Sequence, residues 1–307
     1  LKFMEKLKTI VKGTILENEP MSKHTTYGIG GPAMAYITPK DRFDLAEILK
    51  CCEQFKIPAY FVGSGSNLLV ADRGINGIVL SPAKSLKQLE IKGNSVTAES
   101  GVMLGRLVKE CIKRNFTGLE SLIGVPGTLG GALVMNAGAF GGEISNYLKS
   151  VDIMTMAGQI NTYSCNDIDF SYRFSSFKKD EFILLARFEL ETGDPDIIKN
   201  KKLNASSGRK TNQPLKYRSA GSVFKNHKKY AAGYLIDSAG LKGTRIGDAE
   251  ISKHHANFFI NHGNASASDI TTLIRIARKA VLKKFDIELE LEIKTIGFEK
   301  KELEVYG

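Results

Sequence analysis

The feature that most constrains this chain is an uncharged, glycine-rich segment that runs from Ser121 to Gly142. Its 22 residues would be long enough to span a bilayer as a helix. However, the segment contains seven glycines, Pro126 and Asn136, and a lipid-facing helix interrupted in this way would lose backbone hydrogen bonds that lipid cannot replace. The segment therefore predicts a series of tight turns inside a folded protein and no membrane insertion.

The length of the chain limits the number of domains, and its charge limits the class of partner. The chain has 307 residues and a formal net charge of +10. At roughly 150 residues per domain, we expect two domains or three small ones. The excess of lysine and arginine favours an anionic partner, which could be nucleic acid or a phosphorylated small molecule. Because the basic residues are scattered, with only short clusters such as Lys199–Lys202, the charge alone does not decide between these partners.

The cysteines and histidines predict neither a disulfide framework nor a metal site. Cys51, Cys52, Cys111 and Cys165 form no Cys-x-x-Cys pair, and the five histidines show no ligand spacing. This pattern fits a reducing compartment, and the first residues lack the apolar run of a signal peptide. We therefore expect a cytoplasmic protein without a metal, in which Cys52 and Cys111 are small buried hydrophobes.

Hydrophobic spacing predicts both helices and strands. The predicted helices cover 1–20, Asp41–Lys56 with Asp41 as N-cap, 104–112, the basic stretch 199–210, 232–239 closed by Gly240, and 270–285 with a capping box of Ser266 and Asp269. The predicted strands cover 59–62, 75–80, 96–99, 151–156, 182–190, 256–260 and 286–293.

This order of elements predicts an α+β fold. After the lead-in helix over 1–20, we expect one domain over 21–195, made of α+β subdomains at about 21–85 and 86–195. A linker at Gly193-Asp194-Pro195 would then lead to a C-terminal α+β domain over 196–307.

Two glycine loops are the first candidates for a binding site. Gly63-Ser64-Gly65-Ser66-Asn67 follows a predicted buried strand, where backbone N–H groups can converge on a phosphate, although the loop alone is explained as well by a structural turn. It matches neither the P-loop nor the dinucleotide fingerprint. The second loop, 124–131, continues into 136–139. Two such uncharged loops in a basic protein favour a cradle for a diphosphate or dinucleotide.

The other candidates are ambiguous from the residues alone. Arg173 stands between aromatic residues, where it could stack on a ring or grip a carboxylate. Ser222 could simply end a turn. Glu288, Glu290 and Glu292 would share one face of the last strand, which is normally solvated. One histidine of the pair at 254 and 255 would point inward, as a core or hydrogen-bonding residue more readily than as a metal ligand.

Taken together, the motifs resemble the UDP-N-acetylenolpyruvoylglucosamine reductase family. The matching segments, in the order in which that family has them, are YGIGGPA (27–33), GSGSNLLV (63–70), GLESLIGVPGTLGGALVMNAGAFGGEI (118–144), SYRFSSF (171–177), SAGSVFKN (219–226), AGYLIDSAGLKG (232–243), KHHANFFIN (253–261) and LELEIKTIG (289–297).

The resemblance implies a fold and a cofactor. The first domain would be an FAD-binding domain of the vanillyl-alcohol-oxidase, or PCMH, type, and 196–307 would bind the substrate. The interval between Arg173 and Arg218 is short, so the chain resembles the short form of the family, without its long-form insertion. Non-covalent FAD would be held by Gly63, Ser64, Gly65, Ser66 and Asn67, and by Gly124, Pro126, Gly127, Thr128, Gly130, Gly131, Asn136 and Gly138.

The resemblance also implies a reaction. Hydride would pass from NADPH to FAD N5 and then to the vinyl group of UDP-N-acetylglucosamine enolpyruvate, and the product would be UDP-N-acetylmuramate for peptidoglycan. By motif match, Ser222 would be the proton donor, and Arg173 and Glu292 would stabilise the developing enolate. The residues implied for substrate binding are Tyr172, Lys225, Asn226 and His255.

Two alternatives remain at this point. Another flavin oxidoreductase of the same superfamily would share the glycine loops but need not contain SAGSVFKN. A non-enzymatic anion-binding or nucleic-acid-binding protein would explain the charge but not the uncharged loops. The resemblance favours a substrate-reducing enzyme that binds no nucleic acid.

Overall fold

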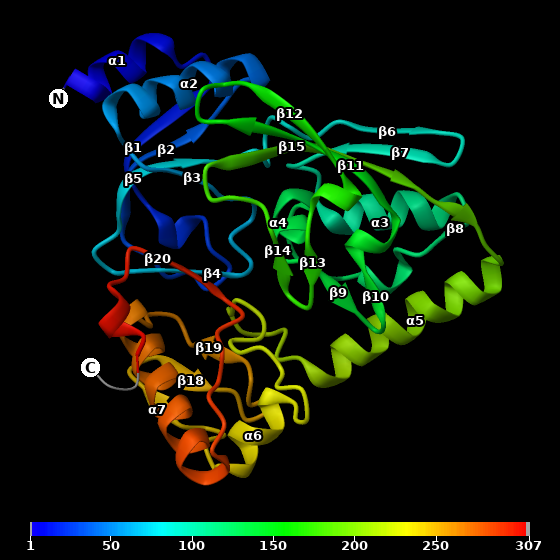
Figure 1. The fold of residues 1–307 in the computed structure, drawn as a ribbon. Coiled ribbons are helices and arrows are strands. Elements are labelled where there is room, and N and C mark those ends of the chain that lie inside the picture. Colours follow the sequence, from blue (N-terminus) through cyan, green and yellow to red (C-terminus); the bar gives the residue numbers. More distant parts are fainter. Residues whose placement is uncertain (1, 305–307) are drawn as a thin grey trace. The chain divides into compact units, whose positions relative to one another are not determined.

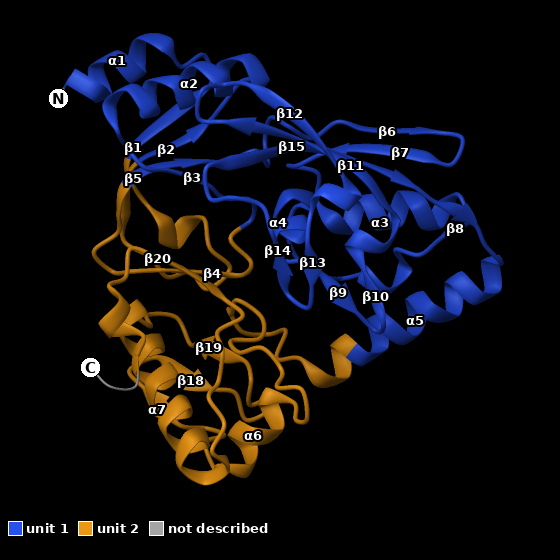
Figure 2. Cartoon of the chain, viewed as in Figure 1, with its two compact units in different colours: residues 1–17, 35–64, 77–208 blue, residues 18–34, 65–76, 209–307 orange. Residues whose placement is uncertain are grey.

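A computed structural model of the chain describes residues 2–304. Its contacts divide the chain into two compact units, which Figure 2 shows in different colours. Unit 1 comprises residues 1–17, 35–64 and 77–208, and unit 2 comprises residues 18–34, 65–76 and 209–307. Each unit is therefore assembled from three separate stretches of sequence.

The first sheet has the strand order β1-β2-β5-β3, and α1 and α2 belong to the same part of the chain (Figure 1). Strands β3 and β5 are parallel. The bounds are α1 Lys2–Ile10, β1 Thr14–Pro20, β2 Pro32–Thr38, α2 Arg42–Phe55, β3 Ala59–Phe61 and β5 Ile75–Leu80. Helix α2 begins as predicted, because the Asp41 side chain accepts hydrogen bonds from the N–H groups of Phe43 and Asp44.

The helix predicted over residues 1–20 is wrong beyond Ile10, and residues 14–20 form strand β1 instead. The chain turns at Lys12 and Gly13, whose N–H groups donate to the Asp44 carboxylate at 3.0 and 2.9 Å. A side chain at Gly13 would collide with the carbonyl oxygen of Thr38. These tertiary contacts override the local helical preference of the sequence.

The second sheet of unit 1 is antiparallel, with the order β12-β11-β15-β7-β6. Its apolar residues and those of α3 and α4 form one core, in which Cys111 is buried as predicted. The bounds are β6 Leu89–Lys92, β7 Ser95–Glu99, α3 Leu104–Lys113, α4 Leu129–Val134, β11 Leu148–Thr155, β12 Ile160–Ser164 and β15 Glu181–Glu189.

Short elements complete unit 1. They are the hairpin pairs β9 Gly138–Ala139 with β10 Gly142–Glu143 and β13 Phe170–Ser171 with β14 Phe174–Ser175, the pair β8 Phe116–Thr117 with β16 Glu191–Thr192, and the 3-10 turns η2 Glu120–Leu122, η3 Ile144–Tyr147 and η4 Cys165–Asp167. The long helix α5, Pro195–Asn212, begins at the predicted linker, where Asp194 accepts hydrogen bonds from the N–H groups of Asp196 and Ile197. The division between the compact units falls within this helix, after Gly208.

Unit 2 packs two helices on small sheets around a second core. Strand β4 pairs in parallel with β20, although more than two hundred residues separate them in sequence. The bounds are η1 Met21–Lys23, β4 Leu68–Val70, α6 Ala232–Ser238, β17 Arg245–Ile246, β18 Ala249–Ile251, β19 Phe259–Asn261, α7 Ala267–Phe285, β20 Lys294–Ile296 and η5 Lys300–Glu302. The predicted capping box of Ser266 and Asp269 is present at the start of α7.

Two strand predictions in unit 2 need correction. Residues 256–257 form a turn, and the strand after the histidine pair begins at Phe259. Residues 286–293 form no regular strand, and β20 begins only at Lys294. The predicted alternation still determines burial, since Leu289 and Ile293 are buried whereas Glu288 and Glu290 are exposed.

Candidate functional site

The start of the first glycine loop lies directly against the second loop in unit 1. A Cβ atom added to Gly63 would lie 2.2 Å from Thr128 Oγ1, and Thr128 is only 2% exposed. No side chain fits at position 63 without displacing the threonine. The structure thus brings together two of the predicted cofactor-binding residues.

Backbone hydrogen bonds hold the second loop to the turn before α3. Leu104 N–H donates to the Gly127 carbonyl at 3.0 Å, Leu129 N–H donates to Val102 at 2.8 Å, and Gly130 N–H donates to Ser100 at 2.9 Å. A Cβ atom on Gly130 would lie 3.1 Å from that of Ser100. The amides of residues 129 and 130 are therefore committed to the protein, and Gly130 is required by close packing.

Several buried polar atoms in unit 1 have no hydrogen-bond partner among the described residues. They are the hydroxyl oxygens of Ser64, Ser85, Ser100 and Ser121 and the Oδ1 atom of Asn136. An unsatisfied buried polar group costs about 1–3 kcal/mol, so such a set calls for an explanation. Three of these residues belong to the two glycine loops and the uncharged segment, and Ser100 packs against Gly130. A ligand with many polar atoms, such as FAD, fits this pattern.

The rest of the first loop belongs to unit 2 and has structural contacts there. Gly65 has a φ of 64°, and a Cβ atom at this position would lie 2.1 Å from the His24 carbonyl oxygen. The Asn67 side chain donates to the Glu292 carbonyl oxygen at 3.2 Å, and Lys294 N–H donates to the Asn67 carbonyl oxygen at 2.9 Å. Gly65 and Asn67 therefore have a role in the fold that does not require a cofactor.

Arg173 lies at the tip of the β13–β14 hairpin in unit 1. Its φ of 56° is unusual for a residue with a side chain, and its Nη2 atom donates to the Gly138 carbonyl oxygen at 3.0 Å. The guanidinium carbon lies 4.9 Å from the ring centre of Tyr172, which is 43% exposed. The stacking interpretation is therefore correct for this pair, and backbone strain of this kind is concentrated at functional sites.

Asn136 supports the same corner of unit 1. Its side-chain amide donates to Glu143 Oε2 at 2.8 Å and to the Ser171 carbonyl oxygen at 3.1 Å, just before Tyr172 and Arg173. Its φ is 41°. The predicted residues Asn136, Gly138, Tyr172 and Arg173 are thus close to one another in the structure.

Ser222 and Glu292 lie in unit 2 on segments that hydrogen-bond to each other. Ser222 forms an antiparallel bridge with Phe258, and Phe224 forms one with Leu291. Glu292 N–H donates to the Val223 carbonyl oxygen at 2.8 Å, and Lys225 N–H donates to Glu290 at 2.8 Å. Of the three glutamates in this segment, Glu292 is half-buried and Glu288 and Glu290 are exposed. The structure therefore distinguishes Glu292 from its neighbours.

The substrate-binding candidates of unit 2 surround the same segment. Lys225 forms an ion pair with Glu290, and Asn226 Oδ1 accepts a hydrogen bond from Ala232 N–H at the start of α6. The Asn257 N–H donates to His255 Nδ1 at 3.2 Å, which places the proton of the neutral ring on Nε2. Burial lowers the pKa of His255 below its ordinary value, although its own backbone hydrogen bond opposes this effect. The imidazole is thus a neutral donor near pH 7.

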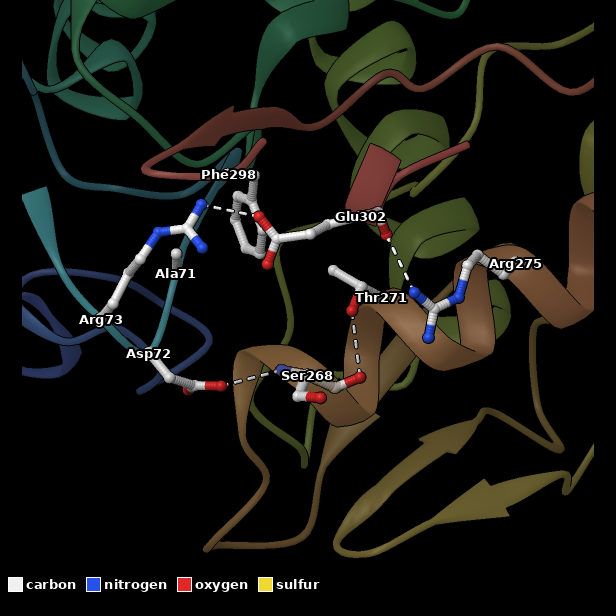
Figure 3. A pocket seen from close by; sticks show the side chains of 8 residues that line it. All are labelled: Ala71, Asp72, Arg73, Ser268, Thr271, Arg275, Phe298 and Glu302. Carbon is white, nitrogen blue, oxygen red and sulfur yellow. Dashed lines mark hydrogen bonds and ion pairs between the residues drawn. The ribbon is translucent and has the colours of Figure 1, made fainter. Parts of the chain in front are cut away.

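A cavity of about 260 Å³ in unit 2 contains none of these residues (Figure 3). Its polar groups already have partners, since Arg73 pairs with Glu302 at 2.6 Å and Asp72 accepts from the N–H groups of Ala267 and Ser268. Within residues 2–304, no group of three potential ligand side chains could hold a metal ion. In the same range, no helix has the length and apolar character needed to cross a membrane.

Sequence reasoning missed three polar residues of these sites. Ser100 and Ser121 border the glycine loops, and Asn257 bonds to the segment that follows Ser222. Ser121 begins the uncharged segment, so its position was a usable signal. Nothing local distinguishes Ser100 or Asn257, because their contacts arise from residues distant in sequence.

Comparisons with known proteins identify a family for both halves of the chain. A model of the "FAD binding domain" family matches residues 33–164, and a model of the "UDP-N-acetylenolpyruvoylglucosamine reductase, C-terminal domain" matches residues 213–296. The UDP-N-acetylenolpyruvoylglucosamine reductase of Clostridium novyi is 42% identical over 97% of both chains. That of Caldanaerobacter subterraneus is 42% identical over 96% of this chain and 98% of its own.

A solved structure agrees with these relatives. The crystal structure of UDP-N-acetylenolpyruvylglucosamine reductase from Thermus caldophilus matches with a TM-score of 0.80 and 33% identity, over 93% of this chain and 99% of that one. The predicted α+β fold, with an FAD-binding domain followed by a C-terminal domain, is confirmed.

Proposed function

Since this chain belongs to the UDP-N-acetylenolpyruvoylglucosamine reductase family, we propose that it reduces UDP-N-acetylglucosamine enolpyruvate to UDP-N-acetylmuramate, with NADPH as the reductant. The chain is a flavoprotein oxidoreductase of peptidoglycan synthesis. The proposal adds the reductant, the hydride and proton steps, the residues that carry them, and a cytoplasmic location.

The unpartnered polar atoms around the glycine loops support the assignment of FAD to unit 1. Ser64 and Asn136 would bind it together with the loop residues 124–131, and Ser100 and Ser121 would join them. Bound FAD would supply two-electron chemistry, taking hydride from NADPH and passing it to the vinyl terminus of the substrate. Thr128 and Gly63 would hold the loops closed around it.

Ser222 would donate its hydroxyl proton to the substrate carbon that becomes negatively charged when the vinyl terminus gains hydride. A serine hydroxyl is a weak acid, so this step requires a desolvated site and a strongly basic acceptor. Solvent would then return a proton to the serine oxygen. Arg173, together with Glu292, would stabilise the developing enolate and its carboxylate in the same step.

The remaining predicted residues would bind the sugar nucleotide. Lys225 and Asn226 would contact the diphosphate or the sugar, Tyr172 would pack on the substrate beside Arg173, and neutral His255 would donate a hydrogen bond through Nε2. The long-form insertion is absent from the interval between Arg173 and Arg218, so these residues would act without that segment.

One observation carries the catalytic assignment. The residue after Ser222 accepts a hydrogen bond from the Glu292 amide, so Ser222 and Glu292 lie on neighbouring, hydrogen-bonded backbone segments of one unit. A serine that only ended a turn would not require this register with a half-buried glutamate.

The test is an anaerobic absorption experiment on the purified protein. Flavin bands should bleach when NADPH is added and return when the enolpyruvyl sugar nucleotide follows. Bands that stay bleached would exclude this substrate and indicate another flavin oxidoreductase. A colourless protein that FAD cannot reconstitute would overturn the cofactor assignment.

A further inference from the structure

Asn257 is a buried residue whose side chain bonds to the segment that follows Ser222. The residue is 3% exposed. Its side-chain Nδ2 donates to the Phe224 carbonyl oxygen at 2.8 Å, and its Oδ1 accepts from Phe224 N–H at 2.9 Å. Its backbone carbonyl accepts from Val223 N–H at 2.8 Å. One residue therefore satisfies both backbone groups of Phe224 and the amide of Val223.

An asparagine is needed here because the backbone cannot make these bonds. Residues 256–257 form a turn, and β19 begins only at Phe259, so a regular strand ladder does not reach Phe224. The carboxamide replaces the missing strand, because it offers a donor and an acceptor on one planar group. Aspartate lacks the donor, and an aliphatic side chain would leave two buried backbone groups without partners.

The opposite edge of the same segment bonds to the residues around Glu292. The Val223 carbonyl oxygen accepts from Glu292 N–H at 2.8 Å, and Phe224 bridges to Leu291. The backbone after Ser222 is thus held between Asn257 on one edge and residues 290–292 on the other. A shift of residues 223–224 would therefore have two effects: it would move Ser222, and it would change the register of Ser222 with Glu292.

We infer that Asn257 is the positioning residue that holds Ser222 in register with Glu292 for proton transfer to the substrate. It acts through the backbone of Val223 and Phe224. The inference rests on the proposed function, since it concerns the proton step of that reaction. Loss of the hydrogen bonds from the Asn257 side chain to Phe224 should slow this step on the order of 10²-fold, the scale expected when a reacting group is misplaced by about 1 Å.

The chain provides a matched control in Asn261. This asparagine is also 3% exposed, and its side chain bonds to three backbone groups, donating to Tyr27 and accepting from Gly263 and Ala265. None of these partners lies in 222–225 or 290–292. Asn257→Ala and Asn261→Ala should therefore lose comparable stability, whereas only Asn257→Ala should impair the proton step.

The first measurement is hydrogen–deuterium exchange without substrate. In Asn257→Ala, the amides of Val223 and Phe224 should exchange faster than in the wild type, and in Asn261→Ala they should not. The second measurement follows the two half-reactions of the FAD-loaded protein by stopped flow. Asn257→Ala should keep flavin reduction by NADPH within about two-fold, slow reoxidation by the enolpyruvyl substrate on the order of 10²-fold, and show a larger solvent deuterium isotope effect on that step.

Two results would overturn the inference. One is a reoxidation rate and isotope effect in Asn257→Ala equal to those of Asn261→Ala; the other is unchanged exchange at Val223 and Phe224. If Asn257→Ala does not fold, Asn257→Ser is measured with the same expectations, because its shorter side chain has one oxygen atom in place of the separate Oδ1 and Nδ2 atoms that bond Phe224. Failure of the proposed function is distinguishable, since the wild type itself would then not be reoxidised by the enolpyruvyl substrate.

Discussion

At the residue scale, the hydroxyl of Ser222 can be removed without changing the backbone that carries it. The neighbouring residues are bonded on both edges, so Ser222→Ala should fold normally. Flavin reduction by NADPH should remain near the wild-type rate, and reoxidation by the enolpyruvyl substrate should fall by about 10²–10⁴-fold, the usual contribution of a positioned acid. Stopped-flow absorbance measures both rates. Ser219→Ala, three residues earlier, is the control, and an equal loss of both half-reactions in Ser222→Ala would exclude the proton-donor role.

Gly63 offers a residue-scale test of the cofactor loops. In Gly63→Ala the new methyl group would meet Thr128 Oγ1 at 2.2 Å, and such overpacking costs about 1–3 kcal/mol. We expect the loops to shift and FAD affinity to fall by about ten-fold or more, as measured by quenching of flavin fluorescence. Gly105→Ala is the control, because nothing lies within 4 Å of its added Cβ atom and a helical alanine is favourable. Unchanged FAD affinity in Gly63→Ala would show that the loops do not hold the cofactor.

At the scale of elements, Glu120 ties helix α5 to the turn before η2. The carboxylate is 2% exposed and accepts hydrogen bonds from Thr117 at 2.9 Å, from Lys201 at 3.1 Å and from the Gly118 amide. Burial raises the pKa of this group, but its hydrogen bonds together lower the pKa by more than burial raises it. The net pKa therefore lies below the ordinary value of 4.5. The folded state therefore binds the proton less readily than the unfolded chain does.

This depressed pKa determines how Glu120 affects stability. Its contribution should be fully present above about pH 4.5 and should be lost as the pH falls through the lower folded value. At pH 7, Glu120→Gln should lower the free energy of unfolding by about 1–3 kcal/mol, and the difference from the wild type should shrink in acid. Urea denaturation at several pH values measures this. Glu110→Gln, which breaks only the surface pairs with Lys113 and Arg114, should lower the free energy of unfolding much less, because solvent screens exposed ion pairs. An equal loss for both variants would contradict the assignment.

Elements with local determinants could be predicted from the sequence. Helices α2 and α7 carry their own caps, Asp41 and the Ser266–Asp269 box. Helix α2 begins one residue after the predicted start, and α7 begins three residues before it. The failures have tertiary causes. Residues 14–20 are a strand because the chain turns at Gly13, and 286–293 is irregular because its backbone bonds to 223–225 instead of to a full strand.

In the candidate site, too, residues with a local signal could be predicted and residues with only tertiary contacts could not. Ser222, Arg173 and Glu292 were predicted because the motifs around them resemble a known family, and spacing alone favoured an ordinary role for each. Ser64 and Asn136 lie in glycine loops that drew attention by their composition. Although Asn257 lies in the matching segment 253–261, its role could not be assigned from the sequence, because it depends on Phe224, which lies 33 residues earlier, before helix α6 and strands β17 and β18.

At the scale of the whole molecule, FAD should act as a structural ligand as well as a redox group. Binding to the folded state alone stabilises a protein by about 2.7 kcal/mol when the ligand is at a hundred times its Kd. We therefore expect the melting temperature of the FAD-free protein to rise as FAD is added, in a concentration-dependent way. Differential scanning calorimetry measures this, with riboflavin, which lacks the diphosphate, as the control. An equal shift with riboflavin would show that the diphosphate cradle contributes nothing.

The discontinuous composition of unit 2 determines when it can form during synthesis. Strand β4 leaves the ribosome more than two hundred residues before its parallel partner β20. At roughly 5–20 residues per second, β4 waits on the order of ten seconds or more with one edge unpaired. Until β20 is made, unit 2 lacks the strand that pairs with β4, so a chain that stops before Lys294 should fail to complete unit 2 although it contains most of the residues of that unit.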